Sequence, residues 1–305
     1  MRLFSQASDV RQAQRIFHGR GQCHEGLEHI CIDALWPTLW VTLYAKPEAL
    51  LFQTLTQHLL NWVDLHAHCK FERILIQHRY RRGTPVEAIW GNVVAEQQVL
   101  RKEATFLVRF DRQNIGFFLD IEPGRRWLEA RSEGKTVLNL FSYTCVFSVV
   151  AHQAGARRVV NVDMSKGALS IGRDNHKINN HRSNQQLAGG VQFLPYDILK
   201  SWSRIRKQGP YDLVIIDPPS FQRGSFVAER DYEKVLRRLQ SMLTPKADVL
   251  ACLNAPELTS AFLDELFRLH APNCLFQSSL PAEPVFRSEN PDRALKLRHY
   301  LYMPP

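Results

Sequence analysis

The chain has 305 residues, of which 45% are hydrophobic and 23% are charged, a balance that is ordinary for a globular protein with a full core. No apolar run is long enough to cross a bilayer, and the N-terminal residues lack the apolar segment of a signal peptide, so we expect a cytosolic, cytoplasmic protein. The net charge of +9 favours a polyanionic partner, most simply a nucleic acid.

The six cysteines are scattered along the chain, and none forms a C-x-x-C pair of the kind found in zinc ribbons and thioredoxin-type sites. The histidines show no H-E-x-x-H spacing or comparable pattern of metal ligands. Isolated thiols in a cytosolic protein are usually reduced and structural. We therefore expect reduced cysteines and no metal site.

The N-terminal part, residues 1–110, is predicted to form a small α+β substrate-recognition domain. A helix is expected after Pro47, because apolar residues recur at helical spacing from Leu51 to Trp62. Segments rich in β-branched and aromatic residues predict the strands. These segments are 29–45, 72–80, 86–94 and 104–110, and another follows at 115–121.

From Lys135 onward, apolar strands alternate with helices, which predicts a parallel sheet covered on both faces. The last two predicted strands, 274–280 and 297–303, have no long helix between them, so they should form an antiparallel hairpin near the sheet edge. The predicted fold class is α/β, with this sheet in a second domain, residues 111–305. The other strands are expected at 136–143, 158–163, 191–198, 211–217 and 247–253.

Polar residues follow the first four strands of this predicted sheet, at the edge where doubly wound sheets bind their ligands. They are the turn Ser142-Tyr143-Thr144, then Asp163, Asp197 and Asp217. This order is typical of a site for a nucleoside-containing cofactor. The turn after the first strand approaches the ligand, the acid after the second binds ribose hydroxyls, and the acid after the third lies near adenine. Because the turn lacks glycine, it is a poor cradle for the pyrophosphate of a dinucleotide, whereas S-adenosylmethionine has no phosphate.

Four motifs together resemble class I S-adenosylmethionine-dependent methyltransferases: VLNLFSYT, FSVVA, VVNVDMSKGAL and IDPPSF. More narrowly, they are similar to the bacterial family of 23S rRNA large-subunit methyltransferases that modify cytosine C5 or guanine N7. The segment QNIGFFLDIEPGRRWL extends the resemblance upstream. The resemblance implies a Rossmann-like sheet, S-adenosylmethionine as the cofactor, and RNA, with rRNA favoured, as the substrate.

The resemblance also implies the site residues. Asp217 and the two prolines after it would face the transferable methyl group, with Asp217 accepting a hydrogen bond from the base and Phe221 stacking on it. The enzyme would mainly align the two reactants. The residues next to the methyl group and base are Asp217, Pro218, Pro219 and Phe221. The cofactor-binding residues are Phe118, Asp120, Arg125, Asn139, Phe141, Ser142, Tyr143, Thr144, Asp163, Met164, Ser165, Asp197, Ile198 and Asp217.

The chain departs from the family's pattern in the turn and in its length. Cys145 and Val146 stand where the family usually has glycine or another small residue. A β-branched residue disfavours positive φ, so Val146 predicts weaker or altered cofactor binding. We interpret Cys145 as a small turn residue rather than a nucleophile. Several relatives also have an N-terminal RNA-binding domain of the pseudouridine-synthase and archaeosine type, for which this chain is too short.

A third departure concerns the methylated atom. Methylation of cytosine C5 requires a cysteine thiolate that adds to C6, and relatives that perform it have this cysteine just after the fifth strand. Asn254 occupies that position here, and Cys252 is expected within the strand as a core residue. A ring nitrogen is therefore favoured over cytosine C5.

Two other functions remain open at this point. The chain could be a methyltransferase-fold RNA-binding protein with weak or no activity, or a methyltransferase that acts on a protein or a small molecule. The segment Gln77–Gly83 combines three arginines with a histidine and a tyrosine in a predicted loop. This composition suits RNA contact and a solvated turn equally well.

Overall fold

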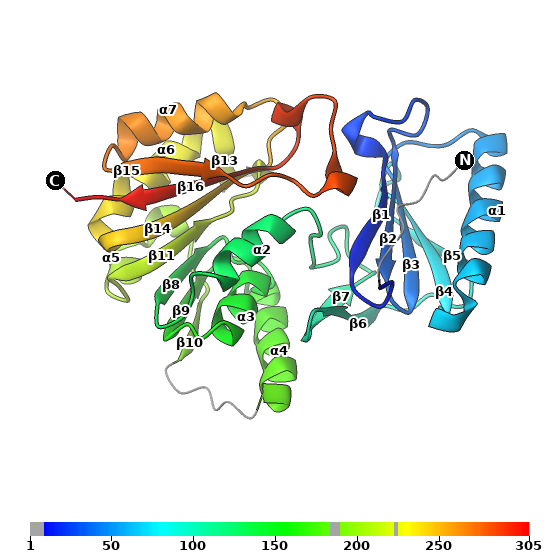
Figure 1. Ribbon diagram of the computed structural model, residues 1–305, viewed down its shortest axis with the longest axis horizontal. Coiled ribbons are helices and arrows are strands. Elements are labelled where there is room, and N and C mark those ends of the chain that lie inside the picture. The colour runs from blue at the N-terminus through cyan, green and yellow to red at the C-terminus, as the bar shows by residue number, and fades with distance from the viewer. Residues whose placement is uncertain (1–8, 184–189, 223–224, 305) are drawn as a thin grey trace. The chain divides into compact units, whose positions relative to one another are not determined.

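The structure is a computed structural model that describes residues 9–183, 190–222 and 225–304 (Figure 1). The chain divides into two compact units. The N-terminal unit contains Met1–Leu119 and Glu283–Glu289, and the C-terminal unit contains Asp120–Ala282 and Asn290–Pro305. None of the helices in the described ranges is both long enough and apolar enough to span a membrane.

The N-terminal unit contains a five-stranded sheet in the order β1-β2-β3-β4-β5 and a separate hairpin, β6-β7. Strands β3 and β4 are parallel, and the other pairs are antiparallel. Helix α1 connects β3 to β4 and buries Leu55, Leu59 and Trp62 in the core of the unit. The elements are β1 (Gln14–His18), β2 (Ile30–Leu35), β3 (Thr38–Leu43), α1 (Ala49–Leu65), β4 (Arg73–His78), β5 (Val86–Trp90), β6 (Glu96–Arg101) and β7 (Ala104–Arg109).

Two features of this unit differ from the sequence-based prediction. Strands β1 and β6 were not predicted, because polar residues in QRIFH and EQQVLR leave too few apolar positions to show alternation. The strand expected at 115–121 is wrong: this segment is a loop that leads into α2, and Gly116 adopts a φ of 100° within it.

The C-terminal unit contains a seven-stranded sheet in the order β10-β9-β8-β11-β14-β16-β15. The first five strands in this order are parallel, and β16 is antiparallel to both of its neighbours. The predicted α/β class and the terminal hairpin are thus confirmed. The strands are β8 (Thr136–Leu140), β9 (Arg158–Val162), β10 (Val191–Leu194), β11 (Tyr211–Ile216), β14 (Leu243–Leu253), β15 (Cys274–Ser279) and β16 (Lys296–Tyr302), and a short ribbon pairs β12 (Phe221–Gln222) with β13 (Phe226–Val227).

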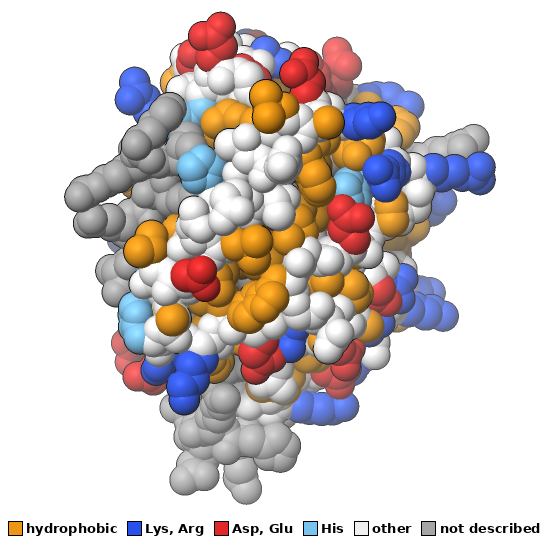
Figure 2. All heavy atoms as spheres, turned by 90° about the vertical axis from the view of Figure 1, so that its right-hand side faces the viewer, with side chains coloured by type: hydrophobic (Ala, Val, Ile, Leu, Met, Phe, Trp, Pro, Cys, Tyr) orange, Lys and Arg blue, Asp and Glu red, His pale blue; other side chains and the backbone are white. Residues whose placement is uncertain are grey.

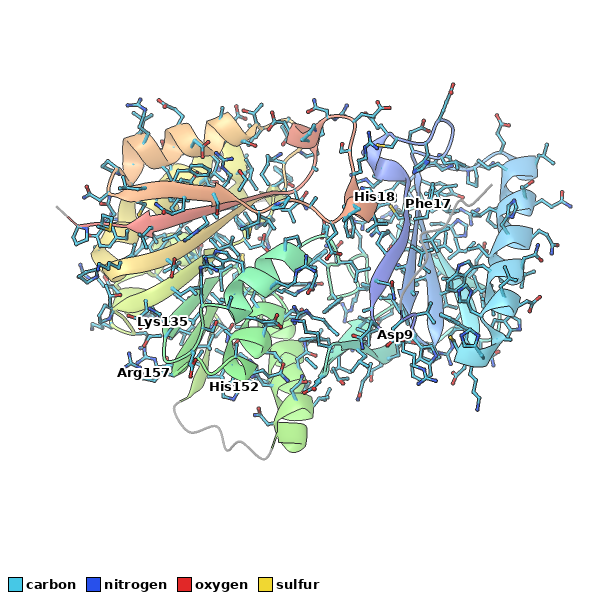
Figure 3. All side chains as sticks on the ribbon, viewed as in Figure 1. Asp9, Phe17, His18, Lys135, His152 and Arg157 are labelled. Atoms are coloured by element: carbon cyan, nitrogen blue, oxygen red, sulfur yellow. The ribbon has the colours of Figure 1, made fainter. Side chains whose placement is uncertain are left out.

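Helices cover both faces of this sheet (Figure 1). The group α2, α3 and α4 lies on one face, and α5, α6 and α7 pack on the other. Lys135 and Arg157 precede β8 and β9, and Figure 3 shows them at the amino-end edge of the sheet. The helices are α2 (Glu122–Glu129), α3 (Val146–Gln153), α4 (Lys166–Ser183), α5 (Trp202–Arg206), α6 (Ala228–Leu239) and α7 (Ser260–His270).

The turn between β8 and α3 is packed against α4. Cys145 adopts a left-handed conformation with φ of 59°, is fully buried, and directly precedes α3. A Cβ atom placed on Gly172 of α4 would lie 2.5 Å from Cys145 Sγ and 2.9 Å from its Cβ. The helix therefore needs a glycine at residue 172 because a cysteine side chain occupies the turn. Val146 is the first residue of α3, so its β-branch causes no strain, contrary to the expectation from sequence.

We predict that Gly172→Ala destabilises the fold by about 1–3 kcal/mol, the usual cost of overpacking a core. Adding Cys145→Gly to this variant removes the clashing thiol and should recover most of the loss. Chemical denaturation of the two single variants and the double variant measures this coupling. Gly167→Ala is the matched control in α4, because a Cβ there meets nothing within 4 Å. If Gly172→Ala lowers the free energy of unfolding equally in the wild type and in the Cys145→Gly variant, the proposed contact between residues 145 and 172 would be contradicted.

Candidate functional site

The carboxyl ends of β8, β9 and β11 form one edge of the C-terminal sheet. Parallel pairing aligns Leu140 with both Val162 and Ile216, the last residues of these strands. The residues that follow, Phe141, Asp163 and Asp217, are therefore adjacent at this edge. It is the edge at which open α/β sheets bind ligands.

The turn after β8 contains no glycine, although several of its residues have positive φ values. Phe141, Tyr143 and Cys145 have φ values of 58°, 45° and 59°, which place three non-glycine residues in the left-handed region. Each such residue costs on the order of 1–2 kcal/mol relative to the right-handed conformation. The backbone N–H of Ser142 donates to the carbonyl of Val162 at 3.1 Å, which fixes the start of the turn against β9. A conformation this unfavourable persists only if its surroundings hold it.

Asp163 is the group that holds the turn from the neighbouring strand. Its Oδ2 accepts a hydrogen bond from the backbone N–H of Tyr143 at 2.9 Å. Its Oδ1 accepts one from the backbone N–H of Ser165 at 2.8 Å. Burial raises the pKa of Asp163, and these two hydrogen bonds oppose that shift. Each carboxylate oxygen retains further acceptor capacity, so the residue can also bind hydroxyl groups of a ligand.

A buried polar network lies beneath the turn. The amide of Asn139 donates to Asn161 Oδ1 at 2.9 Å, and Asn161 in turn donates to Ser148 Oγ at 2.8 Å. Ser148 Oγ lies 2.9 Å from His176 Nε2, and burial lowers the pKa of His176 to about 3. Asn139, which is expected to contact the cofactor, is 1% exposed here, and its side chain supports the end of the sheet. The neutral imidazole of His176 completes this support.

Helix α4 contributes another hydrogen bond to the turn. The amide of Asn175 donates to the carbonyl of Thr144 at 2.9 Å, and both residues are buried. The sequence predicted no role for Asn175 or for Gly172. The cause is that contacts between a turn and a helix about thirty positions away leave no local pattern in the sequence.

Asp217 follows β11 in a cluster of ionisable groups. Burial raises its pKa to about 7, and the negative charge of Asp120 adds to this effect. The positive charge of Arg125 on α2 and a hydrogen bond from the Cys252 thiol act in the opposite direction. Arg125 is buried and forms an ion pair with Glu122 at 3.1 Å. Asp217 is therefore poised to change its ionisation near neutral pH.

Cys252 lies beside Asp217 because β11 and β14 are paired in register, with Ile216 opposite Ala251. It is fully buried within β14, and its pKa is raised well above the ordinary value by burial and by the charge of Asp217. The hydroxyl of Tyr232 donates to the Cys252 carbonyl at 3.2 Å. Asn254 directly follows β14 and is exposed. The expected place of Cys252 within the strand is confirmed, and its thiol is a poor source of thiolate.

The other predicted site residues fall into three groups. Asp197 begins a short 3-10 helix, Ile198–Lys200, accepts the backbone N–H of Leu199 at 3.0 Å, and lies 3.2 Å from Lys200 Nζ. Ile198 and Pro218 are buried, whereas Pro219 is partly exposed. The exposed residues among them are Phe118 (43%), Met164 (46%) and Phe221 (67%), of which Phe118 belongs to the N-terminal unit.

Comparison with known proteins identifies the family. A family model described as S-adenosylmethionine-dependent methyltransferase matches residues 14–302. The chain is 33% identical over 164 residues to ribosomal RNA large subunit methyltransferase I of Aeromonas hydrophila, which covers 52% of this chain and 40% of the relative. It is 34% identical over 185 residues to ribosomal RNA large subunit methyltransferase K/L of Psychrobacter cryohalolentis, which covers 57% of this chain and 23% of the relative.

The chain therefore spans less than half the length of these curated relatives. Among solved structures, a methyltransferase crystallised with SAH superposes with a TM-score of 0.79 at 23% identity, over 96% of this chain and 76% of that one. At this identity the likeness shows a shared fold. Since the family model matches almost the whole sequence, the chain belongs to the S-adenosylmethionine-dependent methyltransferase family, whose cofactor is S-adenosylmethionine.

Proposed function

We propose that this protein transfers a methyl group from S-adenosylmethionine to a base in RNA, with 23S rRNA as the favoured substrate and a ring nitrogen favoured over cytosine C5. The observation that supports this most is the end of β11. There a partly buried carboxyl group is followed by two prolines and an aromatic ring that is 67% exposed, Phe221. A carboxyl group and an exposed ring are suited to hold a flipped or unpaired base.

The residues around the turn fit S-adenosylmethionine. Asp163 has acceptor capacity for ribose hydroxyls, and Asp197 follows β10, where the adenine edge would lie. The bound cofactor supplies a methyl group activated by a positive sulfonium. The protein's part is to bind the two reactants in line, since alignment accounts for most of the acceleration in such a transfer. The prolines limit the movement of Asp217 during this alignment.

The ionisation state of Asp217 decides what it can offer to a base. As a carboxylate it accepts hydrogen bonds from an amino or imino group, and as a neutral acid it can also donate one to a ring nitrogen. With a pKa of about 7, both forms are present near neutral pH. The choice of a nitrogen target rests on Asn254, because the residue after β14 has no thiol that could add to cytosine C6.

The two alternative functions are less well supported. A binding protein without activity was suggested by Cys145 and Val146 in the turn, but Cys145 has a matched space opposite Gly172. A protein or small-molecule substrate would not require the charge of +9, and the relatives named above are ribosomal RNA methyltransferases. RNA is therefore the substrate class that we propose.

We predict that Asp163→Ala weakens binding of S-adenosylmethionine by about 1.5–3 kcal/mol, the scale of losing hydrogen bonds to a charged acceptor. The variant also removes the bond to the Tyr143 N–H, so both the ribose contact and the turn are affected. Isothermal titration measures the change. Asp174→Ala is the matched control, because it removes an exposed carboxylate from α4. Unchanged affinity in Asp163→Ala would place the ribose elsewhere.

We predict that Asp217 lowers the stability of the protein as pH rises. Its folded pKa of about 7 exceeds the unfolded value of about 3.9, so folding takes up a proton between these values. The contribution of the group is therefore fully present below about pH 4 and is lost as pH rises to about 7. Melting temperatures of the wild type and Asp217→Asn, compared from pH 5 to pH 8, should diverge in favour of the variant at higher pH. A constant difference would contradict the raised pKa.

We predict that the wild-type protein transfers labelled methyl groups from S-adenosylmethionine to rRNA isolated from cells that lack this protein, and that Asp217→Asn is slower by about 10²-fold. RNA that contains 5-fluorocytosine should form no covalent complex, because a nitrogen target requires no adduct. Cys252→Ser should retain most of the activity, provided that the buried hydroxyl is tolerated.

The opposite outcomes are specific. Transfer of label to protein alone would overturn RNA as the substrate. A trapped complex that is lost in Cys252→Ser but kept in Cys145→Ser would make cytosine C5 the target and Cys252 the nucleophile. Loss of trapping only in Cys145→Ser would instead assign the nucleophile to the turn.

A further inference from the structure

Three strand ends of the N-terminal sheet bring arginine and tyrosine side chains to one edge. Strand β1 runs antiparallel to β2, β2 antiparallel to β3, and β3 parallel to β4, so the carboxyl ends of β1, β3 and β4 share an edge. Figure 3 shows His18 at this end of β1 and Asp9 toward the other. Arg20, Tyr44 and Arg79 follow the three strands within two residues.

These side chains are in contact with one another. The guanidinium carbon of Arg20 lies 4.4 Å from the centre of the Tyr44 ring, and that of Arg79 lies 5.4 Å from the same centre. In the next loop the guanidinium carbon of Arg81 lies 5.4 Å from the ring centre of Tyr80. We call these side chains, together with Arg82 of the same loop, the arginine edge, which thus consists of Arg20, Tyr44, Arg79, Tyr80, Arg81 and Arg82.

The positive charges of the arginine edge are not neutralised within the unit. Among the described residues, Arg20, Arg81 and Arg82 form no ion pair with a carboxylate, and Arg79 donates to the neutral Asn114 Oδ1 at 3.2 Å. Two carboxylates in the neighbouring segments, Glu87 and Glu28, have other partners. Glu87 pairs with His78 at 2.8 Å, and Glu28 accepts the backbone N–H of Gly26 at 2.9 Å. Bringing like charges together in this way is unfavourable unless a polyanion binds there.

The exposure of the edge allows such binding. Arg20, Arg81 and Arg82 are exposed, and Tyr44, Arg79 and Tyr80 are partly exposed. Helix α1, on the side of the molecule that faces the viewer in Figure 2, contains no lysine or arginine, so the cations of the arginine edge lie outside this helix.

We propose that the arginine edge binds single-stranded RNA and is the RNA-recognition surface of the N-terminal unit. This inference rests on the proposed function, in which RNA is the substrate. Guanidinium groups pair with phosphate oxygens through two hydrogen bonds, and their planes also stack on bases. Stacking requires bases that are splayed out of a helix, which favours a single strand over a duplex.

The test uses the full chain and a fluorescein-labelled single-stranded RNA of about 16 nucleotides, close to the site size of a single-strand-binding domain. Affinity is measured by fluorescence anisotropy over a range of salt concentrations. The double variant Arg20→Gln, Arg79→Gln should bind at least about 10-fold more weakly at low salt. Its log–log salt slope should be shallower by about 1.4, because two phosphate contacts are lost. The labelled duplex of the same sequence should bind more weakly than the single strand.

Arg268→Gln on α7 is the matched control, because it removes an exposed arginine that pairs with Glu265, and it should leave RNA affinity unchanged. The double variant Arg81→Gln, Arg82→Gln alters only exposed residues and keeps the test valid if the first variant unfolds. The inference would be overturned if Arg81→Gln, Arg82→Gln binds RNA as tightly as the wild type does. If Arg20→Gln, Arg79→Gln is folded, it too would have to bind with wild-type affinity.

The two proposals can fail separately. If the wild type methylates RNA and the edge variants bind RNA and turn over normally, only the arginine edge is wrong. If the wild type transfers no methyl group to RNA, the proposed function is wrong. Titration with S-adenosylhomocysteine should give the same affinity for the wild type and every edge variant, because the edge lies outside the cofactor-binding residues. If a variant of the arginine edge loses affinity for both S-adenosylhomocysteine and RNA, the arginine edge would not be an RNA-binding surface separate from the cofactor site.

Discussion

The carboxylate of Asp163 connects the ends of two strands, and the candidate site depends on that connection. One oxygen binds the backbone N–H of Tyr143 after β8, and the other binds the backbone N–H of Ser165 after β9. The turn after β8 contains three left-handed residues, none of them glycine. Residues in this conformation persist only when their surroundings hold them, and Asp163 supplies one of these contacts, beside the hydrogen bonds of Ser142 and Thr144. Asp163 therefore both shapes the turn and remains available to a ligand.

Helix α4 accommodates and anchors the turn. A cysteine at residue 145 adds a side chain where the family usually has none, and a glycine at residue 172 leaves the space for it. Asn175 anchors the Thr144 carbonyl from the same helix. The Cys145 side chain is thus accommodated by Gly172 of α4 without a clash. Altered cofactor affinity at this turn stays a prediction, which isothermal titration tests.

The parallel sheet and the residues at its edge could be predicted from sequence, because uninterrupted apolar runs such as Leu213–Ile216 end abruptly in acids. Strand β1 and helix α2 could not, because QRIFH has too few apolar positions to show alternation and EPGRRWLE contains both proline and glycine. The hydrogen bond from Asn139 to Asn161 could not be predicted either, since it depends on which residues of β8 and β9 are paired. The contact between Asp217 and Cys252 depends on the register of β11 and β14, which no local pattern specifies.

The central claim is that this glycine-free turn, held by Asp163, forms a working cofactor site. Isothermal titration of S-adenosylmethionine into the wild-type protein tests it most directly. The structure predicts saturable binding of one cofactor per chain, with an affinity that S-adenosylhomocysteine shares because it has the same ribose and adenine groups. A protein that is folded by thermal denaturation but gives no heat of binding with either compound would contradict the claim.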